Sequence, residues 1–436
     1  MDSITIIGGG LAGSEAAWQA AKRGISVKLY EMRPRKMTPA HKTDLLAELV
    51  CSNSLRSKDP LSAPGLLKTE LQLAGSIIME AALHSEVPAG SALAVDRTVF
   101  SSYITEKIRS QPLIEIIHEE IEEIPDGFCI IATGPLTSNA LSESLKRLLG
   151  EEHLYFYDAI APIVDAETID FSKVFRASRY GKGGDDYLNC PMNKEEYERF
   201  YNALIEADTV GKREFEDMKV FEGCMPIEIM ARRGPDTLRF GPMKPVGLTD
   251  PRTNKEPFAV VQLRIENRDR TAYNIVGFQT RLKWPEQRRV FRLIPGLEHA
   301  EFLRYGSIHR NTFINGPLFL NKDLSLKIKD SIYLAGQITG VEGYIESTAM
   351  GLIAGINLSR RIKGLPFVPV PPETAHGSLI RYITESEHQG FQPSNINFAL
   401  LPPLEKKTKD KRLRRQLIVK RAIESWTKYM EELKDD

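Results

Sequence analysis

The chain has 436 residues, of which 42% are hydrophobic and 27% charged, proportions that are ordinary for a soluble globular protein. Lysine plus arginine and aspartate plus glutamate number 58 each, so the overall charge predicts no polyanionic partner, and any such site must be a local patch. The four cysteines form no CxxC pair and no zinc-like spacing with histidine, so no metal site is expected and a reducing, cytoplasmic location is favoured. No apolar run of about 18 residues appears and the chain enters a strand at once, so neither a membrane span nor a signal peptide is expected.

The N-terminal residues predict a β-strand, a helix and a second strand in succession. Residues 3–7 form a short apolar run, residues 12–22 are rich in alanine, and residues 26–31 form a second apolar run. Gly24 follows the alanine-rich segment, where a glycine commonly ends a helix in the left-handed conformation. This βαβ unit predicts an α/β fold with a parallel sheet.

A glycine pattern joins the first strand to the helix. It reads Gly8-x-Gly10-x-x-Gly13, and an acid, Glu31, ends the second strand. In a Rossmann-like dinucleotide-binding unit the glycines allow a tight turn, approach of a pyrophosphate and packing of helix on strand, while the acid holds ribose hydroxyls. A glycine-rich turn in another kind of α/β protein is the alternative. The residues expected to bind the cofactor here are Gly8, Gly9, Gly10, Leu11, Ala12, Gly13 and Glu31.

Two later segments resemble returns to the same sheet. Residues 128–135, "FCIIATGP", form an apolar run with a turn at Gly134, and residues 331–360 form a strand, a glycine-rich loop and a long helix that starts near Tyr344. Between them lie short β-like runs separated by proline and glycine, for example residues 273–280. The pattern predicts a discontinuous dinucleotide-binding domain interrupted by an inserted domain.

The predicted domain limits follow from these segments. We expect residues 1–155 and 326–405 to form the two parts of the dinucleotide-binding domain, residues 156–325 an inserted α+β domain, and residues 406–436 a basic C-terminal helix. Residues 406–421 hold nine basic side chains and one acidic side chain. They form either a solvated helix face or an element that contacts the phosphates of a nucleic acid.

Two of the cysteines lie in polar surroundings. Cys51, in "ELVCSNSLRS", is followed by small polar residues with Arg56 nearby, a setting that favours the thiolate. Cys224, in "FEGCMPIE", lies where the chain should turn and could present the thiol. By contrast, Cys129 lies in an apolar strand and Cys190 has no mechanistic argument, so both are interpreted as structural.

Longer motifs then identify a family. The "ATGP" turn and the "YLAGQ" strand resemble the flavin-binding fold of the glutathione-reductase type, and "LAGQITGVEGYIESTAMGLIAGIN" resembles the RNA-modifying flavoproteins that include GidA (MnmG). The segments "GGGLAGSEAAWQAAKRG", "TPAHKTD", "AELVCSNSLRS", "FEGCMPIEIMARRG", "FGPMKPVGL", "HRNTFIN" and "FQPSNINF" resemble one family, the folate- and flavin-dependent tRNA uracil-5-methyltransferases, TrmFO. These motifs cover nearly the whole chain, which is too short for a GidA protein.

The resemblance implies a reaction. Methylenetetrahydrofolate would donate a one-carbon unit to C5 of the T-loop uridine U54 of tRNA, and FAD, reduced by NADH or NADPH, would supply the electrons that turn methylene into methyl. In the family's mechanism the methylene passes through N5 of the reduced flavin. The same chemistry on a ribosomal RNA uridine, a small-molecule flavin oxidoreductase and a non-catalytic RNA-binding flavoprotein are the alternatives.

The chemistry of uracil then gives the cysteines their roles. C5 of uracil is a poor nucleophile until a thiolate adds to C6, and a base must later remove the C5 proton. Both Cys51 and Cys224 match cysteines of the family's motifs. Cys51 is interpreted as the thiol near the flavin that reacts with uracil, and Cys224 as its partner in attack or proton transfer. The sequence leaves open which of the two attacks C6.

The resemblance also suggests further binding residues. Those expected near the flavin are Gly134, Gly336, Gln337, Glu342, Gly343 and Tyr344. Those expected near folate or substrate are His309, Arg310, Lys283, Trp284 and Arg97. The alternatives are a buried structural histidine for His309, an exposed turn for Lys283 and Trp284, and a structural ion pair for Arg97. Those expected to contact RNA are Arg232, Arg233, Lys406, Lys407, Lys411, Arg412, Arg414 and Arg415.

Overall fold

The computed structural model describes most of the chain. The described residues are 3–38, 40–150, 153–181, 184–210, 225–267, 269–389, 391–405, 408 and 410–434. For residues 153–160 and 307–311 it describes the backbone only. None of the helices in this part of the chain has the length and apolar composition needed to cross a bilayer.

A five-stranded parallel sheet forms the centre of the first domain. Its order is β16-β7-β1-β2-β6, and every neighbouring pair is parallel. The strands are β1 (Ser3–Ile7), β2 (Ser26–Tyr30), β6 (Ile114–Ile117), β7 (Cys129–Ile131) and β16 (Ile332–Leu334). The edge strand β16 comes from the last third of the chain, so the α/β fold class and the discontinuous dinucleotide-binding fold are confirmed.

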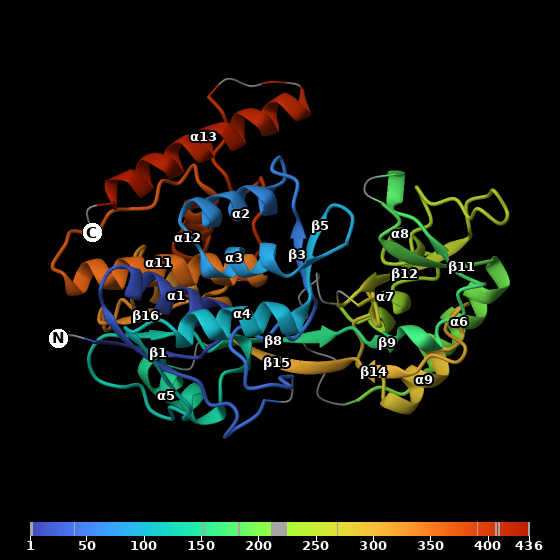
Figure 1. Cartoon of the computed structure of the whole chain (residues 1–436), viewed down its shortest axis with the longest axis horizontal. Coiled ribbons are helices and arrows are strands. Elements are labelled where there is room, and N and C mark those ends of the chain that lie inside the picture. The colour runs from blue at the N-terminus through green and yellow to red at the C-terminus, as the bar shows by residue number, and fades with distance from the viewer. Residues whose placement is uncertain are drawn as a thin grey trace.

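Two helices cross at close range beside this sheet, as Figure 1 shows. They are α1 (Leu11–Lys22) and α11 (Tyr344–Ile362). A Cβ atom placed on Gly351 of α11 would lie 2.2 Å from the carbonyl oxygen of Ala12. The glycine therefore lets the two helix backbones touch, which fixes the starts of both helices next to each other.

Further elements complete the first domain. Its other helices are α2 (Ala63–Leu73), α3 (Ile77–His84), α4 (Arg97–Arg109), α5 (Asn139–Leu149), α10 (Gly316–Phe319) and α12 (Ala375–Glu385). A small sheet of order β3-β5-β4 is made by β3 (Ser54–Ser57), β5 (Ala92–Val95) and β4 (Glu86–Val87). Cys129 lies in β7, and burial raises the pKa of its thiol to about 12, in keeping with its structural interpretation.

The inserted segment forms a second body with its own hydrophobic core. An antiparallel six-stranded sheet has the order β10-β11-β12-β13-β9-β14. Its strands are β9 (Ile163–Asp165), β10 (Phe175–Arg176), β11 (Tyr187–Met192), β12 (Ala259–Ile265), β13 (Ala272–Ile275) and β14 (Phe302–Arg304). Its helices are α6 (Lys194–Glu206), α7 (Ile227–Arg232), α8 (Thr237–Phe240) and α9 (Trp284–Phe291). Cys190 is fully buried in β11, and burial raises the pKa of its thiol.

A two-stranded antiparallel ribbon joins the two bodies (Figure 1). It pairs β8 (His153–Ile160) with β15 (Ser307–Ile314) over their full lengths. The chain thus leaves and re-enters the first domain side by side. The predicted limit at residue 155 falls within β8 and the one at 325 follows β15, and both limits remain predictions.

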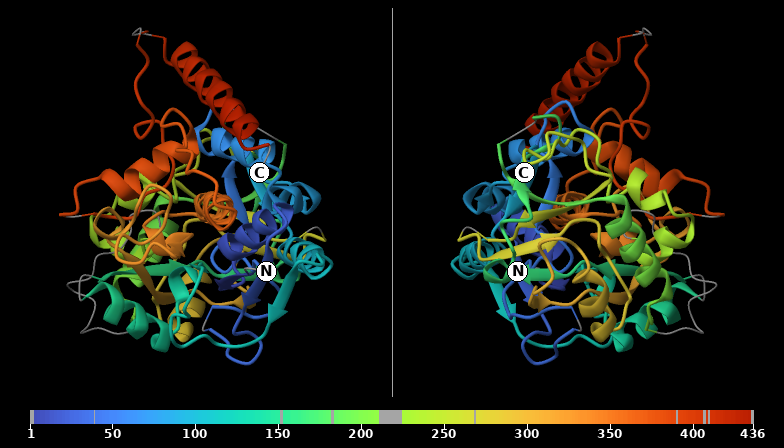
Figure 2. Two further views of the ribbon diagram at one scale, coloured as in Figure 1. Left: turned by 90° about the vertical axis from the view of Figure 1, so that its left-hand side faces the viewer. Right: turned by 90° about the vertical axis from the view of Figure 1, so that its right-hand side faces the viewer.

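The last helix, α13 (Lys411–Glu432), lies across the outer side of the first domain (Figure 2). Trp426 is fully buried there, and its ring stacks on His376 of α12 with the ring centres 4.2 Å apart. The indole Nε1 also donates a hydrogen bond of 2.8 Å to the carbonyl oxygen of Glu70 in α2. Residues 411–417, by contrast, are all exposed, so the basic end of α13 is free of the core.

Candidate active site

A cleft of about 1000 Å³, partly open to solvent, lies where the strands β1, β2, β7 and β16 end. Ligands of open α/β sheets bind at the carboxyl ends of the strands. Residues that line it include Gly8, Gly10, Leu11, Ala12, Glu31, Arg33, His41, Glu48, Val50, Gly134, Gly336, Gln337 and Tyr344. The cleft thus brings together most of the residues predicted to bind a cofactor.

The three predicted glycines differ in what surrounds them. Gly8 has φ +101°, and a Cβ atom there would lie 2.7 Å from the carbonyl oxygen of Ala132. A Cβ atom on Gly13 would lie 1.8 Å from the carbonyl oxygen of Gly8. Around Gly10, however, no atom lies within 4 Å of the Cβ position. Gly8 and Gly13 therefore allow close backbone contacts within the turn, whereas the space beside Gly10 is empty, as approach of a pyrophosphate requires.

Two helices begin at the cleft without a side-chain cap. The N-cap of α1 is Gly10 and that of α11 is Gly343, and neither helix start receives a side-chain hydrogen bond. The first N–H groups of a helix lack partners within the helix and carry a partial positive charge. Both starts are thus suited to phosphate or to the electron-rich end of a reduced flavin.

Glu31 is held by a neighbour that the sequence did not single out. Its Oε2 accepts a hydrogen bond of 2.9 Å from the amide of Gly9, and its Oε1 accepts one of 2.8 Å from Nε of Arg33. Burial alone would raise the pKa of Glu31, but the hydrogen bond and charge of Arg33 bring it below the usual range. The buried Arg33 also reaches Glu48, 3.2 Å away. Glu31 is therefore an oriented carboxylate at the edge of the cleft.

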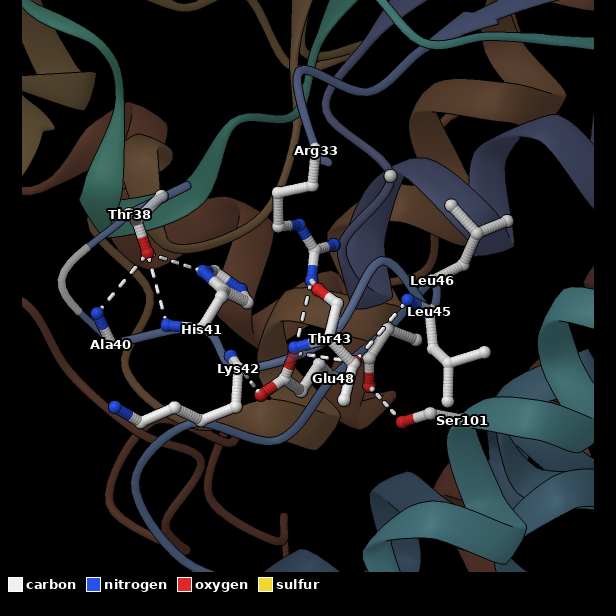
Figure 3. Close-up of polar contacts among 12 residues, drawn as sticks. Arg33, Thr38, Ala40, His41, Lys42, Thr43, Leu45, Leu46, Glu48 and Ser101 are labelled. Atoms are coloured by element: carbon white, nitrogen blue, oxygen red, sulfur yellow. Dashed lines mark hydrogen bonds and ion pairs between the residues drawn. The ribbon is translucent and has the colours of Figure 1, made fainter. Parts of the chain in front are cut away.

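Figure 3 shows how a loop is folded around Glu48 beside the cleft. The Glu48 carboxylate accepts hydrogen bonds from the amide and the hydroxyl of Thr43, at 3.0 and 2.8 Å. His41 Nδ1 lies 2.6 Å from the hydroxyl of Thr38. Burial and the charge of Arg33 lower the pKa of His41 to about 4, so its ring is neutral at pH 7. This histidine belongs to the motif "TPAHKTD", but the sequence pattern did not predict a function for it.

Cys51 lies at the rim of the cleft, one residue after Val50, and is partly buried. Its amide donates a hydrogen bond of 2.8 Å to the phenolic oxygen of Tyr344, and the amide of Ser52 donates another of 3.0 Å. Burial, and next the charge of Cys51, raise the pKa of Tyr344. The first residue of α11 thus fixes the loop that carries the predicted nucleophile.

Two arginines hold the carbonyl groups of the same loop. Arg97 donates to the carbonyl oxygen of Leu49 at 2.5 Å and to that of Cys51 at 3.3 Å, and Arg304 donates to that of Val50. Burial alone would lower the pKa of Arg97, but nearby anionic groups, with Glu266 first, raise it. The thiol therefore lies in a cationic environment made by side chains distant in the sequence.

The expected neighbour of Cys51, Arg56, has an acidic partner of its own. Its guanidinium forms an ion pair of 3.0 Å with the buried carboxylate of Glu346, in the first turn of α11. The expectation that Arg56 acts on the Cys51 thiol stays a prediction, while Arg97 and Arg304 bind the carbonyl groups of the loop itself.

The loop is also tied to the inserted domain. The fully buried side chain of Asn53 donates to the carbonyl oxygen of Ile265 in β12 at 2.9 Å, and its Oδ1 accepts from Arg264 at 2.9 Å. Arg264 donates in addition to the hydroxyl of Ser52 at 2.8 Å. Cys51 therefore lies at the junction of the two bodies, where a substrate bound by one domain can meet a cofactor bound by the other.

The remaining flavin-side residues surround the start of α11. Gly336 has φ +83° and lines the cleft with Gln337, whose amide donates to Glu342 at 2.6 Å. Glu342 is buried, and its hydrogen bond fixes the position of the Gln337 side chain.

Several predicted residues lie away from the cleft or outside the described part of the chain. Cys224, Lys406 and Lys407 fall outside the described residues, as do the side chains of His309 and Arg310. Lys283 pairs with Asp208 at 3.2 Å, and Trp284 is 62% exposed with its ring stacked on Tyr305. Side chains that are exposed on α7, its C-terminal end and α13 are Arg232, Arg233, Lys411, Arg412, Arg414 and Arg415.

Comparison with known proteins places this site in a family. The family model "Glucose inhibited division protein A" matches residues 3–366. The chain is 60% identical to the methylenetetrahydrofolate--tRNA-(uracil-5-)-methyltransferase TrmFO of Moorella thermoacetica over 98% of both chains, and 61% identical to that of Geobacter sulfurreducens over 97% of both. The structure of Aquifex aeolicus GidA matches with a TM-score of 0.70 at 18% identity, covering 99% of this chain and 73% of GidA. That last likeness concerns the fold alone.

Proposed function

The chain belongs to the TrmFO family of methylenetetrahydrofolate–tRNA-(uracil-5-)-methyltransferases, and from this premise we propose that it methylates C5 of U54 in the T-loop of tRNA. The one-carbon unit comes from methylenetetrahydrofolate, and the electrons come from NADH or NADPH. The observation that carries the proposal is the position of Cys51. A thiol on a loop whose carbonyl oxygens are bound by two arginines, at the rim of a dinucleotide cleft, suits attack on a pyrimidine.

The residues of the cleft fit FAD. The open space beside Gly10 and the uncapped start of α1 suit the pyrophosphate, and Glu31 suits a ribose. Gly336, Gln337 and the start of α11 suit the isoalloxazine end. When bound, FAD supplies the electron pair that turns a methylene group into a methyl group.

The chain's own residues would handle the uracil ring. The Cys51 thiolate adds to C6, which turns C5 into an enolate carbon able to attack the methylene carbon. A base then removes the proton from C5, the C6–S bond breaks, and the thiolate is released. We assign Cys224 to the partner role in attack or proton transfer. Arg97 and Arg304 would hold the loop that carries Cys51 in place for the attack, because both donate hydrogen bonds to its carbonyl oxygens.

RNA binding is proposed for the exposed basic residues. The first seven residues of α13 are all exposed and include four cations, although the whole chain is neutral. Such a local cluster can contact several phosphates. We propose that two pairs of residues bind the folate or the RNA, Lys283 with Trp284 and His309 with Arg310. A base in a folded T-loop must be exposed before its C6 can be attacked.

The test is a transfer assay with the purified yellow protein. Methylenetetrahydrofolate labelled in its methylene carbon, NADPH and an unmodified tRNA transcript are incubated together, and the label is mapped by nuclease digestion and mass spectrometry. We expect label at C5 of U54, lost in Cys51→Ala and kept in the matched control Cys129→Ala. Label found in ribosomal RNA alone would show that the substrate is a ribosomal RNA uridine. NADPH oxidation without labelled RNA would indicate a small-molecule oxidoreductase.

A further inference from the structure

Three aromatic rings form a stack on the surface of the inserted domain. Trp284, the first residue of α9, lies on Tyr305 with the ring centres 5.2 Å apart and the ring planes 15° from parallel. Tyr305 lies in turn on Phe302 of β14, at 5.3 Å and 19°, and Phe302 packs against the core of this domain. Trp284 is the outer end of the stack and is 62% exposed, although Tyr305 covers one face of its ring. The other face of the indole is therefore open to solvent.

A buried glutamine fixes this stack in place. Gln287 of α9 is fully buried, and its Nε2 donates a hydrogen bond of 2.8 Å to the carbonyl oxygen of Gly306. Its Oε1 accepts a second hydrogen bond of 2.8 Å from the amide of the same residue. Because Gly306 directly follows Tyr305, these bonds join α9 to the segment that carries the second ring (Figure 1). A ring surface that is already ordered loses little conformational entropy when it binds another ring.

A cation lies on the same stack. Nε of the exposed Arg288 donates a hydrogen bond to the Tyr305 hydroxyl, and its guanidinium carbon lies 5.5 Å from the centre of the Tyr305 ring. Among the described residues Arg288 has no carboxylate within ion-pair distance, whereas its neighbour Arg289 pairs with Glu286 at 2.6 Å. Arg288 thus keeps an unpaired positive charge at the edge of an aromatic surface.

The stack lies next to the loop that carries Cys51. Arg304, the residue before Tyr305, donates a hydrogen bond to the carbonyl oxygen of Val50, which lines the cleft. Trp284 and Tyr305 themselves do not line the cleft. A group bound to the stack would therefore lie beside the cleft and outside it. That position suits a neighbour of the reacting base better than a pterin, whose methylene carbon has to reach the flavin.

We propose that Trp284 and Tyr305 form a platform on which an unpaired base of the RNA substrate stacks, while Arg288 contacts the adjoining phosphate. An aromatic ring can stack on any base, and an arginine neutralises backbone charge, which is how proteins hold single-stranded nucleic acid. The platform holds the strand beside the cleft while the target uridine leaves its loop towards Cys51. The inference rests on the proposed function for its substrate, RNA, and assigns Trp284 to that substrate in preference to folate.

The test measures binding of an unmodified T-arm hairpin RNA to the full-length, FAD-loaded protein by fluorescence anisotropy at several salt concentrations. Trp284→Ala should bind about tenfold more weakly at every salt concentration, because a stacking contact carries no charge. Trp284→Phe keeps a ring and should restore most of the affinity. Arg288→Gln should instead reduce the slope of log affinity against log salt by about 1. Wild-type affinity in flavin-loaded Trp284→Ala would overturn the proposal.

The matched control is Phe240→Ala, which should leave RNA affinity unchanged. Phe240 ends α8 in the same domain and is 82% exposed, but it stacks on no other ring among the described residues. An equal loss of affinity in Phe240→Ala and Trp284→Ala would show that any exposed ring has this effect, and would contradict a specific platform.

A second measurement identifies the stacked base. Hairpins that lack one loop base at a time are bound to the wild-type protein and to Trp284→Ala. One abasic position should weaken binding to wild type about tenfold and leave binding to Trp284→Ala unaffected, because the same contact is already lost. Equal weakening of both proteins by every abasic hairpin would overturn the proposal, as would a raised KM for methylenetetrahydrofolate in Trp284→Ala with unchanged RNA binding. Absence of methyl transfer by the wild-type protein, with Trp284-dependent RNA binding intact, would concern the proposed function alone.

Discussion

At the scale of single residues, two glycines of one turn should respond in opposite ways to the same change. A methyl group on Gly10 meets no atom within 4 Å, whereas one on Gly13 would lie 1.8 Å from a carbonyl oxygen. Gly10→Ala should leave the free energy of unfolding of the flavin-free protein within about 0.5 kcal/mol of wild type. It should weaken FAD binding at least about tenfold, measured by flavin fluorescence titration, because the methyl group occupies the space for the pyrophosphate.

Gly13→Ala should act on the fold. The close contact forces helix α1 away from strand β1, and we expect a loss of about 3 kcal/mol in the free energy of unfolding. Urea denaturation of both flavin-free variants gives the comparison. Equal destabilisation of the two variants would contradict the assignment of Gly10 to the cofactor.

The partly buried His41 predicts a pH dependence of stability. Its pKa in the folded protein is about 4, below the ordinary value of 6.5, so the unfolded chain binds its proton first as the pH falls. The contribution of neutral His41 to the free energy of unfolding is therefore complete above pH 6.5. It is lost between pH 6.5 and 4 and amounts to about 2 kcal/mol, allowing for the partial exposure of the side chain. In urea denaturation at a series of pH values, His41→Gln should lose less stability than wild type over this window. Parallel curves would contradict the neutral state of His41 in the folded protein.

At the scale of elements, α13 combines a packed half with an exposed half. Trp426 is stacked on His376 and bonded to α2, so Trp426→Ala should cost about 3–5 kcal/mol of the free energy of unfolding. Trp284→Ala is the matched control, since this ring is 62% exposed, and it should change stability by less than about 1 kcal/mol. Thermal denaturation of both variants checks the contrast.

The exposed half of α13 should act on RNA and leave the fold unchanged. The variant tested replaces with glutamine the side chains of Lys411, Arg412, Arg414 and Arg415. Each lost phosphate contact should reduce the slope of log affinity against log salt by about 1, with an unchanged melting temperature. Lys428→Gln, an exposed cation at the other end of the helix, is the control. An unchanged salt dependence of tRNA binding would contradict the proposed RNA contact.

At the scale of the whole molecule, the candidate site depends on contacts between distant segments. Tyr344 is 293 residues from Cys51 along the chain, and Arg304 is 254 residues from Val50. The βαβ unit, the returning strands and the cofactor glycines could be predicted because each is encoded by a local pattern. Arg304 and the hydroxyl of Tyr344 acquire their roles only when the chain returns through the ribbon of β8 and β15, which no local spacing reveals. Arg33 acts on Glu31, two residues away, but its burial between two carboxylates could not be read from the spacing.

The ties between the two bodies predict a further effect. Asn53→Ala removes the buried bonds to β12 and leaves Arg264 without its Oδ1 partner, so it should cost about 2–3 kcal/mol of stability. FAD binding should persist because Asn53 does not line the cleft, while methyl transfer should fall at least about tenfold from misplacement of Cys51. Flavin content and single-turnover transfer rates separate these effects, and full transfer activity would show that the tie is dispensable.

The proposed reaction depends most directly on attack of the Cys51 thiol on the target uridine. The most direct measurement uses a T-loop RNA with 5-fluorouridine at U54, whose C5 has no proton to remove, so that the C6–S bond persists. Peptide mapping by mass spectrometry then identifies the cysteine that carries the nucleotide. An adduct on Cys51 that disappears in Cys51→Ala is the predicted result, and an adduct on Cys224 with Cys51 unmodified would contradict the assignment.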